Sequence, residues 1–306
     1  MKQLSPIRQM ILIAALVLLW GVSFPINKMM LQYTPPLLFA GMRTLTGAIF
    51  LVMFLLPKRQ HIQWKRHKHV YIISSLLNVV LFFGLQTYGL KIMSSGLFSV
   101  LVYLQPVLVA LFAWIWLGEQ MSVVKAIGLG FGILGVAAIS TRGEAGHMSG
   151  LGVILGIGTS VSWALGTVYV KKVSSVVHFM WLAAMQCMVG GIILILAGLW
   201  VEPWSAIQWS PVYWAGMGYS GILGVAGSWI LYFTLVRSGE ASVVTSYTFL
   251  VPIVSVLAGM LFLHESFTLY LWLGLIFIGI SIGMVNLKPK SSRTRPAEGK
   301  VLNKFD

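Results

Sequence analysis

The stretch IMSSGLFSVLVYLQPVLVALFAWIWLG, residues 92–118, contains no Asp, Glu, Lys or Arg. It exceeds the roughly 20 apolar residues that a helix needs to cross the hydrocarbon core of a bilayer. The run is continuously apolar and lacks the polar alternation of a strand in an outer-membrane barrel. Because a helix satisfies its own backbone hydrogen bonds in lipid, the stretch predicts a transmembrane helix.

Similar uncharged stretches follow one another along the chain, and residues 29–57 are interrupted only by Arg43. We therefore expect an all-α integral membrane protein with ten transmembrane helices. The first is expected to stay uncleaved, because its apolar run continues through Trp20 and Pro25 without a small-residue cleavage site. The expected spans are 9–29, 36–56, 70–90, 95–117, 122–140, 151–171, 179–201, 212–235, 241–263 and 268–287.

The composition excludes an ordinary soluble domain. Hydrophobic residues make up 58% of the chain and charged residues 9%, whereas a soluble domain is about 25% charged. The single cysteine, Cys187, permits neither an internal disulfide nor a multi-cysteine metal site. We expect no metal site and no cofactor.

The positions of the charges predict the topology. With the N-terminus in the cytoplasm, most of the 21 Lys and Arg residues fall on the cytoplasmic side, including the basic stretch from Lys58 to His69. Lys28, Lys91 and Arg142 fall outside. Cytoplasmic segments are enriched in Lys and Arg, so we expect a multi-pass protein of the inner or plasma membrane with both termini cytoplasmic. The net charge of +14 then reflects topology and contact with anionic lipid, and no nucleic-acid partner is expected.

The two halves of the sequence repeat each other weakly. At a nearly constant offset, Trp20 aligns with Trp163, Lys28 with Lys171, Arg43 with Gln186, Pro106 with Pro252, and Glu119 with Glu265. The predicted organisation is a first five-helix repeat over 1–140, a second over 151–287 and a basic cytoplasmic tail over 288–306. Because five is odd, the second repeat should be inverted in the membrane. Inverted repeats are typical of secondary transporters, with the binding site between the halves near the midplane.

Several motifs occur in both halves and resemble one family. They are Trp20-Gly21 followed by Phe24, the region of Arg43, the run from Pro106 to Leu117-Gly118-Glu119, Gly128 to Gly135, Trp163, Ser238 to Ala241, the run from Pro252 to His264-Glu265, and Gly274 to Gly279. With these residues the chain resembles EamA-type transporters of the drug/metabolite transporter superfamily. The resemblance covers residues 9–287. It implies ten helices, a central cavity and alternating access for small metabolites, often amino acids and often outward. The chain departs from the repeat at Gln186, opposite Arg43, and at His264, opposite Gly118.

Arg43 is the strongest single signal for a site. A charged residue within a span costs about 2.5–3.5 kcal/mol on insertion scales unless it is paired or hydrated. It could face the cavity and hold a substrate carboxylate or a gating partner. Equally, it could extend toward the interface or bond neighbouring helix carbonyls.

Other candidates are polar and aromatic residues at helical spacing, which avoid lipid and turn inward. Many could instead serve interhelical packing. Pro25, Pro106 and Pro252 are expected to bend helices around the cavity. The candidate substrate-binding residues are Trp20, Asn27, Arg43, Asn78, Phe82, Tyr103, Trp163, Trp229, Tyr232 and Tyr247.

Glu119 and Glu265 end the fourth and ninth spans. They could couple transport to protons, but capping the next helix or pairing with a cation is the favoured interpretation. The spans otherwise contain no Asp or Glu. This argues against the deep acid expected of a proton-driven drug exporter.

Together these patterns predict a secondary transporter, not an enzyme, that moves small organic metabolites outward, amino acids or related compounds first among them. Its expected partners are a small-molecule solute and membrane lipid, and self-association is left open. A multidrug or cation exporter and a non-transport membrane protein, such as a lipid scramblase, are the alternatives.

Overall fold

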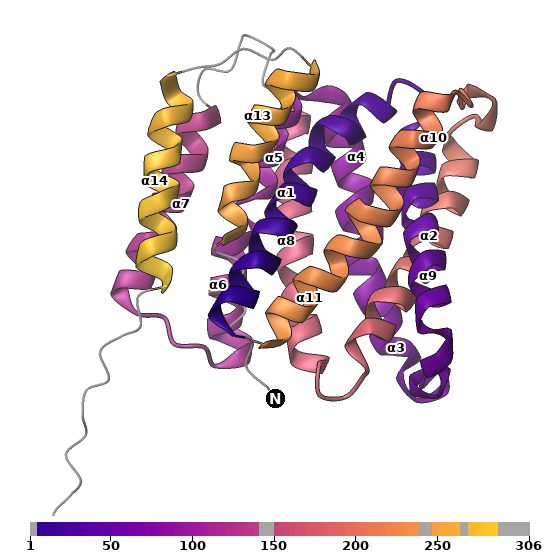
Figure 1. Cartoon of the computed structure of the whole chain (residues 1–306), viewed down its shortest axis with the longest axis horizontal. Coiled ribbons are helices and arrows are strands. Elements are labelled where there is room, and N and C mark those ends of the chain that lie inside the picture. The colour runs from indigo at the N-terminus through magenta and orange to yellow at the C-terminus, as the bar shows by residue number, and fades with distance from the viewer. Residues whose placement is uncertain (1–4, 141–149, 239–243, 245–246, 264–268, 287–306) are drawn as a thin grey trace, which may run out of the picture.

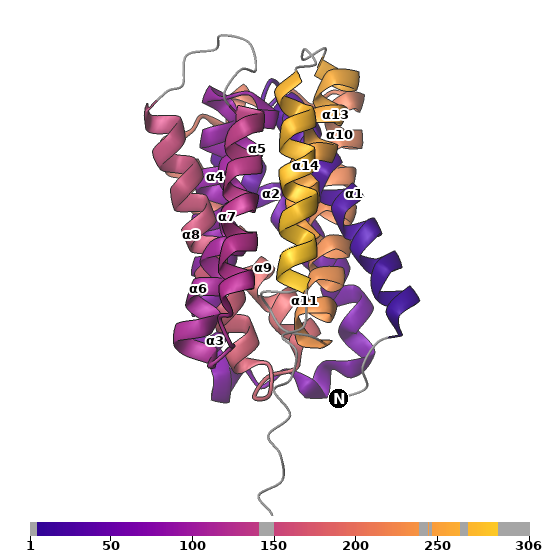
Figure 2. The same ribbon diagram turned by 90° about the vertical axis from the view of Figure 1, so that its left-hand side faces the viewer.

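The computed structural model describes residues 5–140, 150–238, 244, 247–263 and 269–286. Within these ranges the chain forms helices joined by short turns, and no strand occurs. The helices lie side by side in a single bundle (Figure 1 and Figure 2).

The first half contains two continuous spans, one span with a π-helical segment, one broken span and a final shorter helix. In order these are α1 (Pro6–Met30), α2 (Pro36–Leu55), the 3-10 segment η1 (Leu56–His61), α3 (Trp64–Ser75), the π-helical segment η2 (Leu76–Leu81), α4 (Phe82–Ile92), α5 (Ser95–Val102), α6 (Gln105–Leu117) and α7 (Val123–Ser140).

The second half follows the same order. Its elements are α8 (Gly150–Val173), α9 (Phe179–Val201), the 3-10 segment η3 (Trp204–Ala206), α10 (Pro211–Gly218), the π-helical segment η4 (Tyr219–Gly227), α11 (Ser228–Ser238), the 3-10 segment η5 (Tyr247–Leu250), α13 (Val251–Leu263) and α14 (Leu269–Asn286).

The helices coincide with the predicted spans wherever the structure describes them. Seven stretches within the described residues are long and apolar enough to cross a membrane. The three remaining predicted spans are covered by α7, by η5 with α13, and by α14. The prediction of an all-α membrane fold is therefore confirmed.

The fourth span is not one helix. It is interrupted at Tyr103 and Leu104, between α5 and α6, and Pro106 is the second residue of α6. In the ninth span, Pro252 is likewise the second residue of α13, after η5. Proline fits the first turn of a helix, where no N–H partner is needed, so each proline begins a new segment. By contrast, α1 continues through Pro25.

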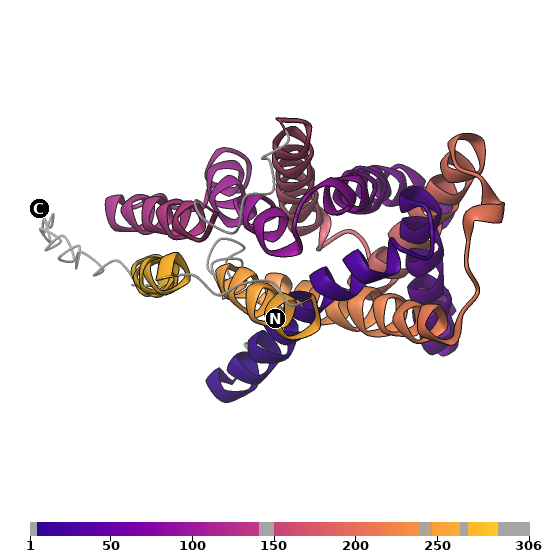
Figure 3. The same cartoon turned by 90° about the horizontal axis from the view of Figure 1, so that it is seen from above.

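Contacts between α2 and α9 are those expected of an inverted second repeat. The carboxylate of Glu202, just after α9, accepts hydrogen bonds from the backbone N–H groups of Leu37 and Leu38 at the start of α2, both at 2.9 Å. At the other end, the Trp181 indole N–H donates to the carbonyl of Lys58, just after α2, at 2.9 Å. The second helices of the two repeats thus run antiparallel. Seen from above, they lie at one end of an elongated cross-section, with α7 and α14 paired at the other (Figure 3).

Two aligned lysines occupy equivalent places in the halves. Lys28, near the end of α1, donates to the carbonyls of Leu90 and Met93 around the end of α4. Lys171, near the end of α8, donates to the carbonyl of Val236 in the last turn of α11 at 2.7 Å. A cation at the carbonyl end of a helix is stabilised by the helix dipole and by the unpaired carbonyls. The correspondence between the two halves therefore includes individual hydrogen bonds from the aligned lysines.

The outside of the bundle is apolar, as a surface in contact with lipid would be. Leu261 and Val123 are each 76% exposed and Trp200 is 90% exposed. A soluble monomer rarely exposes such continuous apolar area. Trp204 and Trp209, which follow Trp200, are also exposed, in the short connection after α9.

Candidate functional site

A small cavity lies between the two halves of the chain, with a volume of about 30 Å³. Seven of the ten predicted substrate-binding residues line it. Those seven are Trp20, Asn27, Arg43, Phe82, Tyr103, Trp163 and Trp229, and Ser23, Phe24, Phe83, Gln86 and Gly224 complete the lining.

One wall of the cavity is aromatic. The ring of Trp163 on α8 lies 5.0 Å from that of Trp20 on α1, 5.1 Å from Phe82 and 5.5 Å from Tyr103. Trp20 and Trp163, which the sequence repeat aligns, meet edge to face at an interplanar angle of 82°. Trp229 on α11 extends the wall, with its ring 6.3 Å from Trp20. Edge-to-face pairs are favoured geometries for aromatic rings, so the wall is a packed surface.

Among the lining residues that the structure describes, Arg43 alone carries a formal charge. Its side chain is 3% exposed, and its Nη2 donates to Gln86 Oε1 at 2.8 Å. The guanidinium carbon lies 4.4 Å from the centre of the Phe83 ring and 5.2 Å from that of Phe39. Within the described residues Arg43 Nε has no hydrogen-bond partner. Arg43 therefore lies at the cavity.

The neutral polar lining comes mainly from α1. Asn27 Oδ1 accepts a hydrogen bond from the Ser220 hydroxyl of η4 at 2.9 Å, and the Ser23 hydroxyl donates to the carbonyl of Leu19 at 2.6 Å. Asn27, Ser23 and Gln86 therefore add amide and hydroxyl groups beside the guanidinium. The cavity combines one cation, neutral polar groups and aromatic rings.

Three of the predicted substrate-binding residues do not line this cavity. Asn78 in η2 donates from Nδ2 to Ser74 Oγ at 3.3 Å, and Ser74 in turn donates to Gln186 Oε1 at 2.5 Å. Tyr247 begins η5 and is partly exposed. Tyr232 lies behind the aromatic wall, with its ring 5.0 Å from Trp20.

The hydroxyl of Tyr232 joins a buried polar cluster. It lies 2.8 Å from Thr167 Oγ1 on α8, and Gln105 Nε2 on α6 donates to it at 3.1 Å. All three residues are fully buried. These hydrogen bonds tie three helices together next to the aromatic wall.

The two π-helical segments, which the sequence does not predict, adjoin the cavity. η2 ends just before Phe82 and Phe83, and η4 contains Gly224. A π-helical turn adds one residue to a helix and is frequent at functional sites. Phe83 and Gly224 are lining residues without a signal in the sequence, since neither is polar nor part of a repeated motif.

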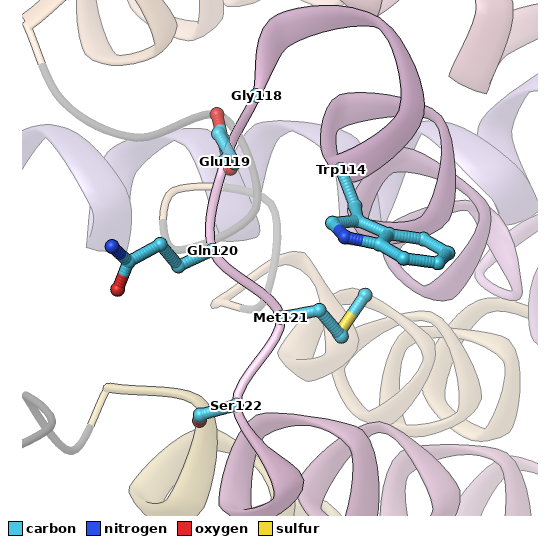
Figure 4. A pocket seen from close by; sticks show the side chains of 6 residues that line it. All are labelled: Trp114, Gly118, Glu119, Gln120, Met121 and Ser122. Atoms are coloured by element: carbon cyan, nitrogen blue, oxygen red, sulfur yellow. The ribbon is translucent and has the colours of Figure 1, made fainter.

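Glu119 lies at a different place from the cavity. Gly118 ends α6 in the left-handed conformation, with φ 68°, and Glu119 Oε2 is 3.8 Å from Lys125 Nζ on α7. Glu119 also lines a surface pocket of about 430 Å³ at the turn between α6 and α7. In this pocket Trp114 and Met121 lie on one side and Gln120 on the other (Figure 4). Glu265 lies outside the described residues.

Comparison with known proteins agrees with this architecture. The model of the EamA-like transporter family matches residues 7–141 and 150–287. An uncharacterized transporter of Bacillus subtilis, YvbV, is 48% identical over 96% of both chains. The uncharacterized inner membrane transporter YedA of Escherichia coli K12 is 26% identical over 94% of both.

A solved crystal structure shares the fold, with a TM-score of 0.77 and 16% identity over 92% of this chain and 97% of the other. With both repeats matched by the family and a relative nearly half identical, the molecule is a multi-pass membrane transporter of the drug/metabolite transporter superfamily. The chain belongs to the EamA-like transporter family.

Proposed function

We propose that this transporter moves small organic metabolites, amino acids or related compounds first among them, outward across the inner or plasma membrane by alternating access. The observation that carries the proposal is the buried Arg43 in an aromatic cavity between the two repeats.

An amino acid offers groups that suit each part of this cavity. A carboxylate forms charge-assisted, often bidentate hydrogen bonds with a guanidinium. An ammonium group is attracted to the faces of tryptophan and phenylalanine rings, and Trp20, Trp163 and Phe82 lie within one wall. An apolar side chain gains from burial against the same rings. The site therefore favours a partly apolar solute that carries a carboxylate.

Alternating access is supported by the size of the cavity and by its surroundings. A volume of about 30 Å³ holds about two water molecules, so a metabolite enters only when helices separate. The break between α5 and α6 lies beside the cavity, at Tyr103. In transporters built from inverted repeats, broken helices typically form the substrate site. We expect opening at one end to accompany closure at the other.

The alternative of a cation exporter fits the cavity less well. Arg43 would repel a cationic drug, and neither described acid lies among the lining residues. The outward direction follows the family resemblance, and the cytoplasmic position of both termini follows the excess of Lys and Arg on one side.

The test is counterflow in proteoliposomes. Vesicles containing the purified chain and an unlabelled amino acid would be given a labelled panel of amino acids, with and without an imposed pH gradient. Arg43→Gln should lower the uptake about 10- to 100-fold, because one charge-assisted hydrogen bond contributes about 1.5–3 kcal/mol. Arg43→Lys, which keeps the charge but not the planar fork, should retain part of it.

Lys172→Gln is the matched control, since it removes an exposed positive charge away from the cavity and should leave uptake unchanged. Wild-type flux in Arg43→Gln would remove Arg43 from the mechanism. If the wild-type chain moves no member of the panel, the proposed substrate class is wrong.

A further inference from the structure

The buried guanidinium of Arg43 is held by a neutral partner. Gln86 Oε1 accepts its hydrogen bond at 2.8 Å, and Phe83, one turn earlier on α4, stacks on it at 4.4 Å. Gln86 itself is 5% exposed and lines the cavity. Thus α4 fixes the guanidinium with an amide and a ring, and neither group neutralises its charge.

Within the described residues no carboxylate is available to do so. The two acids there, Glu119 and Glu202, are engaged elsewhere: Glu119 pairs with Lys125, and Glu202 accepts from the start of α2. A charge in a low-dielectric site interacts strongly with any opposite charge that enters. The cavity therefore carries a positive charge with which an anionic group of the solute can pair.

Among the described residues this arrangement occurs in the first half and not at the aligned position of the second. Gln186, which aligns with Arg43, accepts a hydrogen bond from Ser74, and no cation replaces the arginine there. The groups that would select a solute by its charge therefore lie in the first repeat, on α2 and α4.

We infer that Gln86 is the residue that sets the charge preference of the site. It positions Arg43 without neutralising it, so that the solute must bring the carboxylate. A glutamate at position 86 is nearly the same size as glutamine and could form an ion pair with Arg43. Because that resident carboxylate would take the place of the solute's own, the preference should move from carboxylates to amines. This inference rests on the proposed function.

Three probes that share a phenyl ring and differ in charge make the test: phenylacetate, phenylalanine and phenethylamine. Binding to the purified full chain would be followed by the fluorescence of the cavity tryptophans, and uptake by proteoliposomes. The wild type should prefer phenylacetate and phenylalanine to phenethylamine. Gln86→Glu should weaken binding of both carboxylates at least about tenfold, which corresponds to about 1.4 kcal/mol, and should improve that of phenethylamine.

Gln86→Met separates position from charge. It keeps the length of the side chain but replaces the amide oxygen with a thioether sulfur, which is only a weak acceptor for the Arg43 hydrogen bond, so it should weaken carboxylate binding without improving that of the amine. This variant also tests the inference if Gln86→Glu does not fold, as judged by its thermal unfolding. Carboxylate affinity in Gln86→Met equal to that of the wild type would overturn the positioning role.

The failures of the two proposals are distinguishable. If the wild type binds the carboxylates and a folded Gln86→Glu keeps the same order of preference, the role of Gln86 is wrong and the proposed function stands. If the wild type binds neither carboxylate, while counterflow of the wider amino-acid panel also fails, the proposed function itself is wrong.

Discussion

Arg43 is tolerated in the membrane because its surroundings replace part of the water that it loses. One amide accepts from Nη2, and two phenylalanine rings lie within 5.2 Å of the guanidinium carbon. Cation–π contacts are worth about 2 kcal/mol or more where water is excluded. This is comparable with the insertion cost of an arginine, about 2.5–3.5 kcal/mol. A partly compensated charge is suited to binding an anion reversibly.

Glu202 offers a test of stability at a single residue. The N-cap residue of α2 is Pro35, which provides no side-chain acceptor, and Glu202 instead accepts from two backbone N–H groups of that helix and from the Tyr88 hydroxyl at 3.1 Å. Glu202→Gln keeps one acceptor oxygen and removes the charge that favours the helix N-terminus. Losing a cap costs about 0.5–2 kcal/mol, so Tm in detergent should fall by a few degrees.

Tyr88→Phe is the matched control for Glu202, because it removes one hydrogen bond to the carboxylate and leaves the cap in place. Its Tm should lie between those of the wild type and Glu202→Gln. Unfolding of Glu202→Gln at the wild-type temperature would show that the carboxylate does not stabilise α2.

At the scale of the helix, the sequence predicts spans well and their inner irregularities poorly. Charged residues mark the ends of spans, and Pro106 and Pro252 mark equivalent positions in the repeat. A π-helical segment has no comparable signature, since it needs only one extra residue. The sequence therefore predicts ordinary helix over both η2 and η4.

The candidate site was predictable where a residue type is unusual in lipid. Arg43 and Asn27 stand out because polar groups avoid hydrocarbon, and both line the cavity. Phe83 did not stand out, because a phenylalanine facing lipid and one facing the cavity are equally apolar in sequence. Asn78 is a predicted site residue that bonds to Ser74 on its own helix and does not line the cavity, because a polar residue turns inward either to a cavity or to another polar group.

Packing of α2 against α9 depends on close approach at Gly41. A Cβ atom added there would lie 2.6 Å from Ile195 Cγ1 and 2.8 Å from the backbone nitrogen of Ile195, so the helices would have to separate. Gly41→Ala should cost about 1–3 kcal/mol, as overpacking of a core does. Thermal unfolding would measure the loss, and uptake should fall as well because Arg43 lies two residues further along α2.

Gly130→Ala on α7 is the matched control for Gly41→Ala. No atom lies within 4 Å of a Cβ at Gly130, and alanine is favoured over glycine in a helix by about 0.5–1 kcal/mol. This variant should be as stable as the wild type or more so. Equal changes in Tm for both glycines would contradict the role of close approach.

For the whole molecule, inversion links the topology to the site. Because α2 and α9 run antiparallel, Lys28 and Lys171 donate hydrogen bonds to carbonyls at helix ends on opposite sides of the bundle. The cavity is lined by residues from both repeats, so under the proposed alternating access a movement of one repeat against the other would change which side can reach it. An orientation in the membrane then decides which opening faces the cytoplasm.

That orientation can be tested with single cysteines in a Cys187→Ala background, because Cys187 is the one cysteine of the chain and is fully buried. Gln32, between α1 and α2, and Gln60, in η1, are both exposed. With the N-terminus in the cytoplasm, a membrane-impermeant maleimide should label Gln32→Cys in intact cells and Gln60→Cys only after permeabilisation. The Cys187→Ala parent, which should remain unlabelled in both conditions, is the control.

The opposite labelling pattern would place the basic segment around Lys58 outside, against the distribution of charge that predicts the topology. Labelling of both positions in intact cells would contradict a membrane span between them.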